Sequence, residues 1–317
     1  MVDQIASAAV CRGCGAQIND RQVDAGGLCD TCATVFGAPS FGYQANQGQP
    51  FQQDYLPGTE TQRPDPDNPP WGPLTGIGVW VASFLALVIV PIIAVGVWLL
   101  IEKLRGAPLP NFTVPEEIQQ WLISPNVLLV QVVSTSIAHA VTIAICWAVV
   151  TKLKKRPFLD SLGWSWGGHS KWYWLAFSFC VLIGLQIAAQ GLARVLPEAP
   201  SPFDQMLKTS VQIRIAVAAM AIFTAPLVEE IVYRGILYSA LRKRLGLVAT
   251  VVVVTLVFGG VHIIQNFGAW VSISGLMLLS LAMTTVRAKT KSVLPCFFIH
   301  TVNNTVASIL ILITKSS

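Results

Sequence analysis

The chain has 317 residues, of which 53% are hydrophobic and only 12% are charged, and its mean hydropathy is +0.60. Soluble domains carry about 25% charged residues, so this composition excludes an ordinary soluble protein and indicates segments that span a bilayer. The net charge of +5 does not indicate a nucleic-acid-binding protein, because the basic residues lie between apolar runs and form no single basic stripe.

The N-terminal region contains four cysteines in two CxxC pairs, Cys11, Cys14, Cys29 and Cys32. Two such pairs supply four thiolates to one tetrahedral ion, so the spacing predicts a zinc-ribbon-like domain over residues 1–36 with a structural zinc. Two disulfides are the alternative, and thiols that stay reduced in the cytoplasm favour zinc. A ribbon of this kind could recruit a cytoplasmic protein partner.

Residues 37–73 are rich in Gly, Pro, Gln and Asn. Such a stretch cannot bury enough apolar surface to fold by itself. We therefore predict a flexible, disordered linker here, between the ribbon and a membrane domain at 74–317.

Seven apolar runs follow, and several approach the roughly 20 residues that a helix needs to cross the hydrocarbon core. The runs are 74–101, 127–150, 172–192, 211–228, 247–264, 269–286 and 293–314. The predicted fold class is an all-α polytopic membrane protein with about seven transmembrane helices in a lipid bilayer, preceded by the small ribbon and the linker.

The charge of the loops predicts the orientation of these helices. Basic residues gather after the second, fourth and sixth runs: Lys152, Lys154, Lys155, Arg156; Arg242, Lys243, Arg244; Arg287, Lys289 and Lys291. The positive-inside rule places these loops in the cytoplasm. With seven spans in the cell membrane, the N-terminus is then cytoplasmic and the C-terminus lies outside. A reduced zinc ribbon agrees with that side.

Ionisable groups inside a membrane span are costly, and the fourth run leads directly into three of them. Glu230 and Arg234 are four residues apart, so they share a helix face and can pair. Glu229 is turned about 100° away and is free to meet groups from other helices. The Glu230–Arg234 pair could also be a purely structural link between helices.

Two later runs carry further polar groups at helical spacing. Phe258 and His262 are four residues apart on the fifth run, and His300 and Asn304 are four apart on the seventh. Glu230 and His262 each lie roughly 15 residues from the turn between their runs, and equal distances from a turn mean equal depth in a hairpin.

One unpaired carboxylate, two histidines and one amide thus lie on three separate helices, which favours a functional site over isolated core groups. A proton or ion path in a transporter is the alternative. His139, alone on the second run, is expected to be an ordinary core histidine.

Three segments carry a resemblance to a known family. EEIVYRG at 229–235, FGGVH at 258–262 and HTVNN at 300–304 fit the patterns EExxxR, FxxxH and HxxxN, in that order. Together they resemble the CPBP family of intramembrane proteases, which comprises the type II CAAX prenyl endopeptidases and the bacteriocin-processing (ABI) proteins. The resemblance covers about 211–314 and leaves out the ribbon and the linker.

The resemblance implies a role for each matched residue. Glu229 would be the general base that activates water, His262 and His300 would hold the water or a metal, and Asn304 would stabilise the developing oxyanion. The supporting residues that it implies are Glu230, Arg234 and Phe258.

Two mechanisms remain open at this stage. A catalytic zinc would take Glu229, His262 and His300 as its three protein ligands and keep one open position. Without metal, a buried glutamate and a histidine can activate water directly.

The predicted function is an intramembrane endopeptidase that cleaves a membrane-associated or CAAX-like peptide substrate. The alternative is a non-catalytic membrane scaffold or transporter of the same fold, with the ribbon recruiting a cytoplasmic partner.

Overall fold

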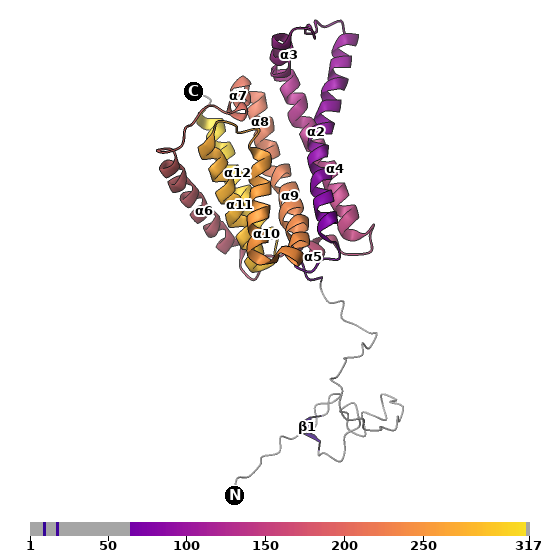
Figure 1. Ribbon diagram of the computed structural model, residues 1–317, viewed down its shortest axis with the longest axis vertical. Helices are drawn as coiled ribbons and strands as arrows, with labels where there is room; N and C mark the ends of the chain where they lie inside the picture. The colour runs from indigo at the N-terminus through magenta and orange to yellow at the C-terminus, as the bar shows by residue number, and fades with distance from the viewer. Residues whose placement is uncertain (1–8, 11–16, 19–63, 315–317) are drawn as a thin grey trace. The chain divides into compact units, whose positions relative to one another are not determined.

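The computed structural model describes residues 9–10, 17–18 and 64–314 (Figure 1). The chain divides into two compact units at Glu60 and Thr61. In the first unit, β1 (Ala9–Val10) pairs antiparallel with β2 (Gln17–Ile18). The four ribbon cysteines and residues 37–63 of the expected linker lie outside the described residues, so the zinc site stays a prediction.

The second unit is built from α-helices. Among the described residues, six helices are long and apolar enough to cross a membrane. They are α2 (Pro73–Leu104), α4 (Pro125–Thr151), α6 (Lys171–Leu192), α11 (Trp270–Thr290), α12 (Leu294–Thr314) and a long interrupted helix at Val211–His262. The expected class, an all-α polytopic membrane protein, is confirmed.

The long interrupted helix is long enough for two crossings. Its 52 residues would extend about 78 Å if straight, against a hydrocarbon core of about 30 Å. Gly246 breaks it, with φ 75° and ψ −177°. The chain then returns to the end from which it started, because Phe203, shortly before Val211, donates its N–H to the carbonyl of Gln265 at 3.1 Å. The second unit can thus cross seven times, in agreement with the seven apolar runs.

The first arm of this hairpin alternates between α- and π-helix. Its parts are α8 (Val211–Ala219), η1 (Met220–Thr224), α9 (Ala225–Glu229), η2 (Glu230–Leu237) and the start of α10 (Tyr238–His262). π-Helical turns are rare and frequently occur at functional sites. The irregular part of the arm is where the candidate catalytic carboxylates lie.

Short helices close the two ends of the bundle (Figure 1). They are α3 (Pro115–Leu122), α5 (Phe158–Leu162) and α7 (Pro202–Thr209). At the start of α7, Ser201 and Asp204 form a capping box, which satisfies backbone donors that the helix itself leaves open. The cap fixes α7 directly before α8.

The three basic loops gather at one end of the unit. Gly163, which ends the short helix α5 that follows the first basic loop, accepts a 3.0 Å hydrogen bond from the N–H of Val293, so the end of α5 and the loop after α11 are neighbours. Gly163 has φ 71°, and a Cβ there would collide with the carbonyl of Lys291. Lys243, from the third basic loop, donates to the carbonyl of Pro69. This clustering is what the positive-inside argument requires.

Residues 64–72 belong to the helical unit, although the composition places them in the linker. Asp67 forms an ion pair with Arg287 at 2.7 Å, and Trp71 is buried and donates its indole N–H to the carbonyl of Ile236 at 3.3 Å. The compact unit begins at Thr61 rather than at residue 74. Arg287, which the sequence suggests is a loop charge, is completely buried.

The outer helices differ from the inner ones in what they expose. Many large apolar side chains on α2 and α6 are exposed, among them Ile92, Ile93 and Ile187. The largest buried cluster centres on η2 and α10, with Ile236, Tyr238 and Phe258. Exposed apolar faces around a packed interior are what helices facing lipid require.

Candidate active site

Glu229 and Glu230 are adjacent in sequence and have different surroundings. Glu229 ends α9, lines a cavity of about 490 Å³, and its side chain is 23% exposed. Glu230 begins η2 and is completely buried. Successive helical residues point about 100° apart, so one carboxylate faces the cavity and the other the protein interior.

Glu230 is paired with Arg234 in the interior. The Nη1 of Arg234 lies 2.9 Å from the Oε1 of Glu230, as the spacing of four residues predicts. Two residues of α11 complete the shell: Nη2 donates to the carbonyl (3.2 Å) and Oγ (2.8 Å) of Ser280, and Nε to the Oγ1 of Thr284 (3.3 Å). A buried ion pair is stable only when its remaining donors are satisfied, and α11 satisfies those of Arg234.

The ring of Phe258 packs against the arginine and the two histidines of the site. Its ring centroid lies 4.6 Å from the guanidinium carbon of Arg234, a cation–π contact. The rings of His262 and His300 lie at 4.8 Å and 6.0 Å from the same ring. Phe258 is fully buried, so it holds the arginine and both histidines in fixed positions.

His300 connects the two carboxylates. Its Nδ1 lies 2.9 Å from the Oε1 of Glu230, and its Nε2 lies 3.7 Å from the Oε2 of Glu229. In a neutral ring that donates from Nδ1 to this carboxylate, Nε2 is an acceptor. The 3.7 Å distance is too long for a direct hydrogen bond, so Nε2 and Glu229 are both available to a third group that lies beside them and bridges them.

His262 lines the same cavity from the end of α10. Its Nδ1 lies 2.8 Å from the carbonyl of Phe258, one helical turn earlier. A carbonyl only accepts, so Nδ1 is again the donor and Nε2 the acceptor. Both histidines therefore offer a ring nitrogen with a free lone pair.

Asn304, on α12, makes a hydrogen bond to the backbone of the π-helical turn η1. Its Nδ2 donates to the carbonyl of Ala221 at 2.9 Å. In a helix, the carbonyl of Ala221 would accept from the N–H of Ala225 or of residue 226. Here the N–H of Ala225 donates to the carbonyl of Met220, and Pro226 has no N–H, so Ala221 has no helical donor. One amide hydrogen of Asn304 fills this position, and the other is left for a ligand in the cavity that Asn304 lines.

The three predicted metal ligands do not form a ligand set. Among residues 64–314, no three His, Cys, Asp or Glu side chains converge on a point that could hold a metal ion. His300 meets Glu229, but the ion pairs of this region include none between His262 and either glutamate. The donors as arranged do not fit a three-ligand zinc site, which needs bonds of about 2.0–2.2 Å.

His139 has a partner of its own. It is buried in α4, its Nδ1 lies 2.9 Å from the Oγ1 of Thr224, and it is not part of the cavity lining. The structure thus places it in the core, beside the end of η1.

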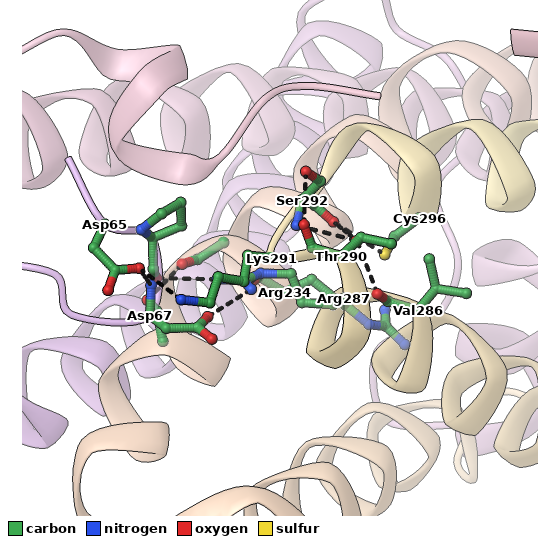
Figure 2. A network of polar contacts seen from close by, with 12 residues as sticks. Asp65, Asp67, Arg234, Val286, Arg287, Thr290, Lys291, Ser292 and Cys296 are labelled. Atoms are coloured by element: carbon green, nitrogen blue, oxygen red, sulfur yellow. Dashed lines mark hydrogen bonds and ion pairs between the residues drawn. The ribbon is translucent and has the colours of Figure 1, made fainter. Parts of the chain in front are cut away.

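Arg287 is a part of the site that the motifs do not reveal. Its Nε donates to the carbonyl of Arg234 at 3.0 Å, its Nη1 pairs with Asp67 at 2.7 Å, and its Nη2 donates to the carbonyl of Pro66 at 3.0 Å. Figure 2 shows this network between the start of the helical unit and α11. Local sequence alone does not mark it: Arg287 lies seven residues after Ser280 on the same helix face, but that relation points to the site only once Ser280 is seen to contact Arg234.

The comparison with known families agrees with the three motifs. Residues 211–306 match the family model described as Rce1-like, type II CAAX prenyl endopeptidase. The matched stretch contains both glutamates, Arg234, both cavity histidines and Asn304, and it begins after α6. No curated protein and no solved structure matches the chain.

Proposed function

We propose that this chain is a CAAX-type intramembrane endopeptidase that hydrolyses a peptide bond in the cavity beside Glu229. One observation carries the proposal: a partly exposed carboxylate faces the free ring nitrogen of His300 across 3.7 Å, while Glu230 holds the other nitrogen. The membrane helices and the family match over 211–306 support the same reaction class.

The geometry supports general-base activation of water. A water molecule beside the gap can donate one hydrogen to the Oε2 of Glu229 and the other to the Nε2 of His300. Glu229 takes the proton as the water oxygen attacks the carbonyl carbon of the peptide. Glu230 keeps His300 in the tautomer that accepts, in the way that a carboxylate orients a histidine in other hydrolases.

The remaining steps use the other cavity residues. The second amide hydrogen of Asn304 donates to the oxyanion that forms as the carbonyl is attacked. The C–N bond then breaks, and Glu229 returns its proton to the leaving nitrogen, so that one water is consumed and a carboxylic acid and an amine are released. His262 offers its Nε2 as an acceptor for an N–H of the leaving amine.

This scheme uses no metal, because the predicted ligands do not converge. It expects hydrolysis to be unaffected by prolonged dialysis against a chelator such as EDTA. Loss of activity that is restored by one equivalent of zinc would replace it with the zinc mechanism.

The decisive experiment is substrate trapping with Glu229→Gln. The change is nearly isosteric and removes the base, so the variant should fold, retain peptides that the wild type cleaves, and hydrolyse none of them. Mass spectrometry identifies the retained peptides, and the same peptides are then given to the wild type. Glu116→Gln, on the exposed face of α3, is the matched control and should behave as the wild type. Full activity in Glu229→Gln would end the protease assignment and favour a scaffold or transporter.

A further inference from the structure

The loop that joins α4 to α5 carries a cluster of basic side chains without partners. The cluster is Lys152, Lys154, Lys155 and Arg156. Its three lysines are exposed, and within residues 64–314 none of the four side chains forms an ion pair or a hydrogen bond. By contrast, Arg287 at the same end of the bundle is paired with Asp67. The loop therefore presents positive charge that the described part of the chain does not neutralise.

The backbone of this loop is held in an unfavourable conformation. Lys152, Leu153 and Lys154 have φ angles of 47°, 56° and 76°, a left-handed region that residues other than glycine enter rarely and usually one at a time. The buried Thr151 fixes the turn, because its Oγ1 accepts from the N–H of Lys154 at 3.1 Å and its carbonyl from the N–H of Lys155 at 2.8 Å. The turn leaves Leu153 70% exposed beside the basic side chains. Backbone strain of this kind is concentrated where a function uses the geometry, which points to a ligand outside the loop.

The chain after α5 carries aromatic side chains typical of a membrane interface. Trp172 and Tyr173 lie in the first turn of α6 and are both exposed. The Nζ of Lys171 lies 5.3 Å from the centroid of the Trp172 ring. Tryptophan and tyrosine concentrate where a bilayer meets water, and lysine there directs its charge to the headgroups. The connection from α4 to α6 thus has the composition of a segment that lies among lipid headgroups.

The same connection packs against the arm that carries the candidate catalytic carboxylates. Leu162, in α5, is completely buried, and a Cβ on Gly235 would come within 2.9 Å of its Cδ2. Gly235 directly follows Arg234 in η2. The hydroxyls of Ser165 and Ser292 lie 2.7 Å apart, which links the connection to the loop before α12. A ligand bound here would contact the bundle at the end where α5 meets η2 (Figure 1).

The chemistry of the loop identifies the ligand as an anion at a membrane surface. Four basic residues directly beside the end of a membrane helix attract anionic lipid headgroups. A soluble acidic partner would use the lysines but would leave the exposed Leu153 without an apolar phase. The positive-inside rule requires only charge at this end and no fixed backbone geometry. If the charges served only to orient the helices, the folded protein would not discriminate between lipids.

We propose that the α4–α5 loop binds anionic phospholipid, with its four basic side chains on the phosphates and Leu153 among the acyl chains. The inference does not depend on hydrolysis, so it stands or falls separately from the proposed function. It adds a ligand that the cavity does not use, a lipid with a negatively charged headgroup such as phosphatidylglycerol.

Lipid binding by the full chain in neutral detergent micelles tests this. Dioctanoyl phosphatidylglycerol and dioctanoyl phosphatidylcholine have the same chains and differ in headgroup charge, and calorimetry measures their dissociation constants. The wild type should bind phosphatidylglycerol roughly 10- to 100-fold more tightly, since each basic residue at an anionic surface contributes up to about fivefold. The variant with Lys152→Gln, Lys154→Gln, Lys155→Gln and Arg156→Gln should bind both lipids equally weakly.

A matched control removes the same number of exposed basic residues elsewhere and should keep the full preference. Its changes, at the ends of α2, α6 and α7, are Lys103→Gln, Arg105→Gln, Arg194→Gln and Lys208→Gln.

Two measurements on the wild type need no variant. An increase in salt from about 0.05 M to about 0.5 M should remove most of the preference for phosphatidylglycerol, because ions screen exposed charges. Glycerol 1-phosphate, which has a phosphate but no acyl chains, should not displace the bound lipid. These measurements decide the matter if the four-residue variant does not fold.

Four results would overturn the proposal. Equal affinity of the wild type for the two lipids would reduce the cluster to an orientation signal. A preference that survives in the four-residue variant would place the lipid elsewhere, and a preference that is lost in the control as well would assign it to net charge. Displacement of the lipid by glycerol 1-phosphate would assign the loop to a soluble anion.

Discussion

Glu230 and Arg234 show how much a spacing of four residues can and cannot predict. Their pairing follows from helical geometry alone, and the structure places the two charged atoms 2.9 Å apart. The partners of Arg234 on α11, Ser280 and Thr284, could not be inferred, because the rotation of one helix against another is absent from local periodicity. The same limit hides the contact between Asp67 and Arg287.

The burial of this pair gives a prediction for Arg234→Ala. The change leaves the Glu230 carboxylate without its cation in a site closed to water, and we expect a loss of about 3–5 kcal/mol in the free energy of unfolding. Activity should fall as well, since Glu230 would no longer hold His300 in place. Thermal denaturation together with a hydrolysis assay measures both effects.

A double variant separates the two effects. Glu230→Gln with Arg234→Met removes both charges and should recover part of the stability but little activity. An unaltered melting temperature in Arg234→Ala would contradict the closed, paired site.

At the scale of elements, the seven apolar runs correspond to the six candidate membrane helices once the interrupted helix is counted as two arms, but the fourth run ends too early. The sequence reading stops at Val228 because the charged residues that follow lower the hydropathy, whereas the helical arm continues to the break at Gly246. The π-helices η1 and η2 were not predictable from the apolar pattern. Only Pro226, which lacks a backbone donor, hints at them.

Pro226→Ala tests what the irregular arm does. The new N–H can bond to a carbonyl of the preceding turn and compete with Asn304 for Ala221, which should draw the arm toward a regular α-helix. We expect equal or higher thermal stability and lower hydrolytic activity, because Glu229 and Asn304 would both be displaced. Pro91→Ala, inside α2 and away from the cavity, is the matched control and should not affect activity. Full activity in Pro226→Ala would show that the π-turns do not position the site.

At the scale of the whole molecule, the start of the helical unit is bound to the half that contains the candidate site. Residues 64–72 reach Arg287 through Asp67, and Arg287 reaches the backbone of Arg234. Composition predicted a linker up to residue 73 because Pro and Gly dominate an average taken over the stretch. One carboxylate and one indole, on Asp67 and Trp71, are enough to attach its last residues to the bundle.

Asp67→Asn should lower the free energy of unfolding by about 1.5–3 kcal/mol, the range for a lost charged hydrogen bond. Deletion of residues 1–60 should leave the melting temperature of the helical unit unchanged, because it spares Asp67 and Trp71. The two shortened or altered chains are compared by thermal denaturation in the same detergent. A deletion that destabilises the unit as much as Asp67→Asn does would show that the preceding residues also support it.

The orientation of the bundle is a separate prediction. The clustered basic loops predict a cytoplasmic N-terminus and an exterior C-terminus. Alkaline phosphatase fused after Thr314 should therefore be active in a bacterial host, and a fluorescent protein that folds only in the cytoplasm should be fluorescent when fused at the N-terminus. The reverse result for both fusions would invert the topology.

The buried ion pair also bears on how the chain is made. During translation, the arm with Glu230 and Arg234 reaches the membrane before α11 and α12 have been made. The hydrogen-bond partners of this pair on those two helices are therefore still absent. Both charges sit on one helix, four residues apart, and can neutralise each other as soon as that helix forms. If the pair were divided between two helices, each charge would enter the membrane alone. With both charges on one helix, the arm enters the bilayer as a nearly neutral segment and acquires its remaining partners later.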